Sequence, residues 1–148
     1  MIEVSKTIRI LFNRAKGDID LPGFNNFPNN SCEGAALFLG AVLKKYFPSS
    51  PILYVKGEDN NGASHYWLES ENLIYDITAD QFTQFQEPIF GESEQSLIEL
   101  FPILTKVPVL EALEKSDVTT ETYKKTMQMD LECYLTNRSK WTLNSSVF

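Results

Sequence analysis

The feature that most constrains the fold is a dense apolar helical pattern over residues 32–46. Its apolar side chains recur three and four positions apart, at Ala35, Ala36, Leu39, Val42, Leu43 and Tyr46. That spacing places them on one broad face of an α-helix. A helix with so wide an apolar face has to be covered on several sides. We therefore expect it to be the central, largely buried helix of the domain.

Extended segments follow this helix. The sequences ILYVKG (52–57), SHYWLES (64–70) and NLIYDIT (72–78) are rich in β-branched and aromatic residues, and the last two alternate around a polar turn. The segment QEPIFG adds a further strand, and its Pro88 suits the edge of a sheet. These segments predict a small antiparallel sheet.

Helices are expected on either side of the strands. Helical spacing predicts an amphipathic helix over residues 3–15 and a last helix over 118–136. The segment 95–116 has two prolines and weak periodicity, so we expect short helices there. One helix, then strands, then helices is typical of an α+β domain with an antiparallel sheet. A chain of 148 residues suits a single domain, so we assign 1–148 to one domain.

Composition excludes several classes of function. The net charge of −7 repels phosphate backbones, so no nucleic acid is expected as a partner. No apolar run approaches the ~20 residues that span a bilayer, and the N-terminus lacks the pattern of a signal peptide. We therefore expect a cytoplasmic protein without membrane contact. A single histidine, no paired-cysteine motif and no glycine-rich phosphate loop predict neither metal nor cofactor. The oligomeric state is left open.

Cys32 stands at the junction between a polar loop and the central helix, where a serine or aspartate would be the ordinary cap. The positive end of the helix dipole favours a thiolate at this position. The backbone N–H groups of the first turn lack helical acceptors and can stabilise an oxyanion. A cysteine here makes sense if its sulfur is reactive.

The only histidine, His65, lies in the predicted hairpin. A two-residue loop at Ser70-Glu71, or a four-residue loop over 69–72, places His65 opposite Asp76. The same register places Trp67 opposite Ile74 and Glu69 opposite Asn72. Opposed residues project from one face with Cβ atoms ~4.5–5.5 Å apart, so the carboxylate can meet the imidazole.

Each of these residues also has a structural interpretation. A cysteine before an apolar helix is often a small buried residue, a lone strand histidine is mostly structural, and an aspartate at a strand end can satisfy backbone donors. The combination is more specific than its parts. We interpret Cys32 as a nucleophile, His65 as its general base and Asp76 as the group that orients the base.

The segments SCEGAALFLGAVL, SHYWLES and LIYDITADQF together resemble the transglutaminase-like branch of the papain-like cysteine enzymes. In that superfamily a nucleophilic cysteine opens a helix packed on an antiparallel sheet, with a histidine on one strand and an aspartate on the next. The common pattern His-x-Trp-x-Glu is matched by His65, Trp67 and Glu69, and Thr78 follows Asp76 as is usual there. The resemblance covers residues 27–82.

The resemblance implies a papain-like core, with the N-terminal and central helices packed on the sheet. It also implies a cysteine-dependent hydrolase or acyltransferase that acts on an amide or thioester, of peptidase, amidase, glutamine deamidase or transglutaminase type. A peptide or protein amide is then the expected substrate class. The alternative is a catalytically relic papain-like fold that binds a cytoplasmic partner. We interpret Glu33 first as an ordinary first-turn acid that interacts with the helix dipole. It also favours this alternative, because the superfamily often has an uncharged residue after the cysteine and an acid there would raise the pKa of the thiol.

The sequence does not identify the group that completes the oxyanion hole. The glutamine that serves papain has no clear match in this chain. Asn26, Asn29 and Asn30 lie close enough in sequence to substitute for it. Trp67 is a candidate wall of the cleft or a core residue. Asn26, Asn30 and Trp67 are therefore the candidate substrate or oxyanion residues.

The two cysteines should differ in reactivity towards iodoacetamide. Cys32 should be alkylated faster near neutral pH because it opens a helix, whereas Cys133 sits in an apolar helical stripe and should react only on unfolding. Peptide mass spectrometry after timed labelling measures both rates. Equal rates in the folded protein, or faster labelling of Cys133, would contradict the assignment.

Overall fold

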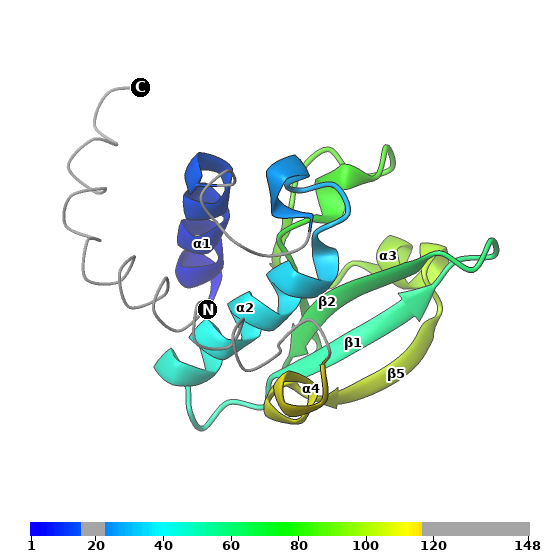
Figure 1. Cartoon of the computed structure of the whole chain (residues 1–148). Helices are drawn as coiled ribbons and strands as arrows, with labels where there is room; N and C mark the ends of the chain where they lie inside the picture. Colours follow the sequence, from blue (N-terminus) through cyan, green and yellow to red (C-terminus); the bar gives the residue numbers. More distant parts are fainter. Residues whose placement is uncertain (16–22, 117–148) are drawn as a thin grey trace.

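The computed structural model describes residues 1–15 and 23–116, which form an α+β structure around one open antiparallel sheet (Figure 1). In this part of the chain the α-helices are α1 (Ile2–Ala15), α2 (Cys32–Tyr46), α3 (Gln95–Leu100) and α4 (Val109–Lys115). The strands are β1 (Leu53–Glu58), β2 (Ser64–Ser70), β3 (Leu73–Asp76), β4 (Ile89–Glu92) and β5 (Ile103–Pro108). Two 3₁₀ turns, η1 (Phe24–Asn26) and η2 (Ala79–Gln81), complete it. The five strands lie in the order β4-β3-β2-β1-β5.

The expected elements are mostly confirmed. The helices over 3–15 and 32–46, the three strands and the edge strand at QEPIFG all form. The segment 95–116 contains short helices as expected, but the prediction missed β5, which pairs with β1 at the other edge. This strand has no alternation of buried and exposed residues, because nearly all of it is exposed. The predicted helix over 118–136, with Cys133, lies outside the described residues.

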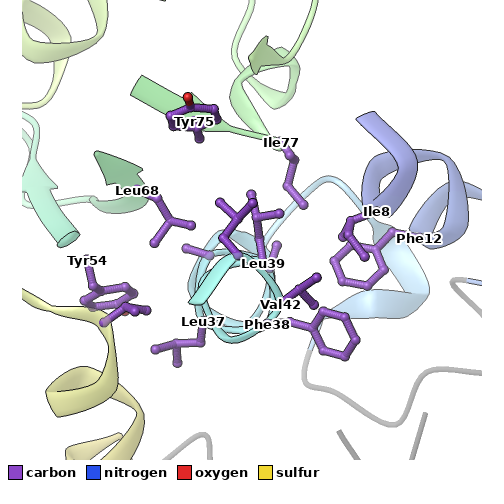
Figure 2. Close-up of a cluster of buried hydrophobic side chains, with 14 of the residues drawn as sticks. Ile8, Phe12, Leu37, Phe38, Leu39, Val42, Tyr54, Leu68, Tyr75 and Ile77 are labelled. Carbon is purple, nitrogen blue, oxygen red and sulfur yellow. The ribbon is translucent and has the colours of Figure 1, made fainter. Parts of the chain in front are cut away.

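The central helix α2 is covered on several sides, as its pattern predicts. Figure 2 shows α2 in the middle of an apolar cluster, with Ile8 and Phe12 of α1 on one side and Leu68 and Tyr75 of the sheet on another. The remaining side is closed by α4. A Cβ at Gly40 would lie 2.3 Å from a methyl group of Val109, so only glycine permits this approach.

A second apolar cluster lies on the opposite face of the sheet, under α3. Its buried residues are Val55, Trp67, Ile74, Ala79, Ile89, Leu97 and Phe101. Successive side chains of a strand point to opposite faces, so Leu68 joins the cluster around α2 while Trp67 joins this one. The packing is tight where β1 meets α3, because a Cβ at Gly57 would lie 2.5 Å from the carbonyl oxygen of Phe101.

The predicted register of the β2–β3 hairpin is wrong by two residues. Glu69 pairs with Ile74 rather than with Asn72, so His65 is not directly opposite Asp76. The turn residues are Glu71 and Asn72, both with positive φ, instead of Ser70 and Glu71. Two successive residues with positive φ match the right-handed twist of a hairpin. A shift of two positions keeps every side chain on its face, so His65 and Asp76 remain diagonal neighbours on one side.

No helix within residues 1–15 and 23–116 combines the length and the apolar character needed to cross a membrane.

Trp67 is fully buried, so its truncation should be costly. Trp67→Ala should lower the free energy of unfolding by about 3–5 kcal/mol, because the cavity removes packing as well as transfer energy. Leu104→Ala is the control: Leu104 is 54% exposed, and its truncation should change stability by only about 0.5 kcal/mol. Urea unfolding curves measure both, and a Trp67→Ala variant as stable as the control would contradict the assigned burial.

Candidate active site

His65 and Asp76 form a buried hydrogen bond between β2 and the end of β3. The distance between Nε2 of His65 and Oδ2 of Asp76 is 2.6 Å, and both side chains are 0% exposed. A carboxylate only accepts, so Nε2 carries the donated proton. The other carboxylate oxygen, Oδ1, accepts from the backbone N–H and the hydroxyl of Thr78, each at 2.9 Å. Asp76 is thus held by three hydrogen bonds in one orientation.

Aromatic rings fix the plane of the imidazole. Trp67 stacks on His65 with 5.9 Å between ring centroids, Phe82 meets it edge-on at 4.7 Å, and Phe101 lies tilted at 5.0 Å. Such rings keep water from the imidazole and restrict its rotation. Phe101 carries no sequence signal for this role, because it lies in the segment of weak periodicity.

Cys32 is the first residue of α2 and is partly exposed. The preceding residue, Ser31, occupies the cap position without capping the helix: its hydroxyl donates to the carbonyl of Pro28 at 2.9 Å. The loop before it is closed at Gly23, where φ is +82° and a Cβ would lie 2.2 Å from the carbonyl oxygen of Asn30. The first turn of α2 therefore lacks the usual side-chain cap beside the thiol.

The imidazole of His65 lies between Asp76 and Cys32. Since Nε2 is bonded to Asp76, Nδ1 is the ring nitrogen left for the thiol, and this buried atom has no aligned hydrogen-bond partner among the described residues. Burial by itself lowers the pKa of His65. The charge and hydrogen bond of Asp76, and then the neighbouring thiol of Cys32, more than offset this and raise the pKa from 6.5 to about 9. The site therefore favours imidazolium at neutral pH.

The space between α2 and the strands beside Cys32 is closely filled and has no room for a water molecule. Cys32 and Ala36 line it from α2, and Asp76 and Thr78 line it from the end of β3. Ligand pockets typically measure ~300–1,000 Å³, so a ligand could reach Cys32 only from its exposed side.

The structure brings Cys32, His65 and Asp76 together, and the other candidates lie around them. Asn26 and Asn30 are exposed in the loop that precedes α2. Trp67 is fully buried behind the imidazole, and its indole N–H donates to Glu69 at 3.3 Å, so it presents no surface to a substrate. Glu69 in turn pairs with Lys106 of β5.

Sequence reasoning missed Arg9 of α1, which pairs with Asp80 just beyond β3. Nothing distinguishes Arg9 from other polar residues of an amphipathic helix, so its sequence context carries no signal.

Within the described ranges, no group of three or more histidine, cysteine, aspartate or glutamate side chains is arranged to hold a metal ion. Comparison of the chain with protein-family models, curated proteins and solved structures found no match. The chemistry of the site consequently rests on its own geometry.

The pKa of His65 can be measured without overlap, because the chain has one histidine. NMR titration of the imidazole should give a midpoint near 9, and Asp76→Asn should return it towards or below 6.5. A raised folded-state pKa adds stability that is complete below pH 6.5 and is lost as the pH rises to about 9. Wild-type stability should fall across that window more than that of Asp76→Asn. A wild-type midpoint at or below 6.5 would contradict the site.

Proposed function

We propose that this protein is a cysteine-dependent hydrolase or acyltransferase of the papain-like, transglutaminase-like type, acting on an amide or thioester. The observation that carries the proposal is the buried 2.6 Å bond between His65 and Asp76 beside the start of α2. It leaves Nδ1 of the imidazole for Cys32. The order of the elements also supports it, since the cysteine opens the central helix, the histidine follows on β2 and the aspartate on β3.

The reaction proceeds through a covalent acyl-enzyme. In the resting ion pair the proton of Cys32 is held on Nδ1 of His65, and the thiolate forms a bond with the acyl carbon. The carbonyl oxygen takes up the electron pair and is stabilised by N–H groups in the first turn of α2. As the tetrahedral intermediate collapses, the bond to the leaving amine or thiol breaks and His65 returns the proton to it. Water or an amine then attacks the thioester and releases Cys32.

Asp76 supports each proton transfer. Its carboxylate stabilises the imidazolium that forms when Cys32 loses its proton. Because Thr78 holds the other carboxylate oxygen, Asp76 also fixes the ring so that Nδ1, and not Nε2, is available to the thiol. Buried partners that cannot rotate away are suited to this task.

The second candidate is a relic fold that binds a protein partner without turnover. Its specific support is the enclosure of the site: His65 is fully buried and the space beside Cys32 is closely filled. The acidic side chain of Glu33 adds to this support. Burial first and then the charge of Glu33 raise the pKa values of Tyr54 and Tyr66, so negative charge lies close to the thiol. An enzyme must expose its base to the leaving group, whereas a binding protein need not.

Intact-mass analysis after treatment with acyl thioester and epoxide probes separates the two candidates. The enzyme should gain one adduct, on Cys32, that is absent from Cys32→Ser. His65→Ala should slow adduct formation by about 10²-fold or more, as expected for loss of a general base, and Asp76→Asn should slow it less, because it removes charge but keeps an acceptor.

Glu111→Gln is a matched control, because Glu111 pairs with Lys115 on the surface of α4, away from the site. It should react at the wild-type rate. A folded wild-type protein that forms adducts no faster than His65→Ala would contradict the enzyme and favour the partner-binding protein.

A further inference from the structure

Arg9 of α1 makes three hydrogen bonds to the segment that follows β3. Its Nη1 donates to the carbonyl oxygen of Ile77 at 2.5 Å and to Oδ1 of Asp80 at 2.6 Å, and its Nη2 donates to Oδ2 of Asp80 at 2.7 Å. The two charged side chains are only 12% and 19% exposed. A planar guanidinium that binds both carboxylate oxygens fixes direction as well as distance. Arg9 thereby fixes the backbone at Ile77, the residue next to Asp76.

The same guanidinium reaches the loop that leads to Cys32. Its Cζ lies 5.0 Å from the ring centroid of Phe27, which is buried in that loop. A guanidinium above an aromatic face is attracted to the ring by a cation–π interaction. Arg9 therefore contacts both the segment that carries Asp76 and the loop that carries Cys32.

A second connection joins these two segments directly. The side chain of Gln81 donates through Nε2 to the carbonyl oxygen of Thr78 at 3.0 Å and accepts through Oε1 from the backbone N–H of Asn30 at 3.4 Å. Asn30 is two residues before Cys32. Movement of the turn around Asp80 would therefore displace both the segment that follows Asp76 and the loop that precedes Cys32.

We propose that Arg9 is a positioning residue of this site, which holds Asp76 against His65 through Ile77 and Asp80 and steadies the Cys32 loop through Phe27. Its importance for chemistry rests on the proposed function, whereas its effect on the His65–Asp76 bond does not. Removal of the guanidinium leaves a largely buried carboxylate and a backbone carbonyl without their donor. The segment should respond by shifting towards water, and Asp76 shifts with it.

Arg9→Lys and Asp80→Asn test this role. Arg9→Lys keeps the positive charge but cannot bind both carboxylate oxygens of Asp80, and Asp80→Asn removes the negative charge that Arg9 binds. The readouts are the NMR titration midpoint of His65 and the rate of Cys32 alkylation at about pH 7. The titratable groups at His65 are Asp76 and Cys32, since its other neighbours, Trp67, Phe82 and Phe101, do not titrate. Each variant should lower the midpoint by about one pH unit and slow alkylation by about tenfold.

Two control variants separate positioning from general stability. Val109→Ala truncates a buried contact between α4 and Gly40 of α2, so it should lower the melting temperature without moving the His65 midpoint. Lys6→Gln removes an exposed ion pair with Glu3 on the same helix as Arg9 and should change neither quantity.

The proposal is overturned if Arg9→Lys and Asp80→Asn lower the melting temperature but keep the wild-type midpoint and alkylation rate, as Val109→Ala should. If Arg9→Lys does not fold, Asp80→Asn decides the question alone. A midpoint that shifts in these variants, in a protein that forms no acyl-enzyme, upholds the positioning role of Arg9 and overturns the proposed function instead.

Discussion

The buried hydrogen bond between His65 and Asp76 is the interaction on which the rest of this structure depends. Taking a carboxylate and an imidazole out of water is costly unless both are paired and hydrogen-bonded. The fold meets that requirement: Thr78 satisfies the second carboxylate oxygen, and the ring of Trp67 covers one face of the imidazole. Removing either partner would leave the other buried and unsatisfied, so the stability of the fold and, under the proposed function, its chemistry depend on the same pair.

Under the proposed function, the position of this bond gives a reason for the cysteine at the start of the central helix. His65 shares the strand face of Trp67, opposite the face on which α2 packs, and its imidazole also neighbours Cys32 at the start of α2. The pairing of β2 with β3 ends at Leu68 and Tyr75, before His65 is reached. Beyond this pairing, Asp76 bonds to one ring nitrogen while the other is left towards Cys32.

Much of the fold and the identity of the three central residues could be predicted because they leave local patterns. Helical spacing located α2, and alternation placed His65 and Asp76 on one face even though the register was wrong by two, since the side-chain period of a strand is two. The strand β5 was missed because an exposed edge strand lacks alternation. Arg9 was missed because its partners lie 68 and 71 residues away, and no local pattern reports such a contact.

The central claim is that His65 activates Cys32, and the most direct measurement is the rate at which iodoacetamide alkylates Cys32 in wild type and in His65→Ala at about pH 7. Peptide mass spectrometry separates this group from the second cysteine of the chain. The account predicts that His65→Ala slows alkylation of Cys32 by about tenfold or more, because the nucleophile loses its neighbouring base. Equal rates in the two folded proteins would contradict the account.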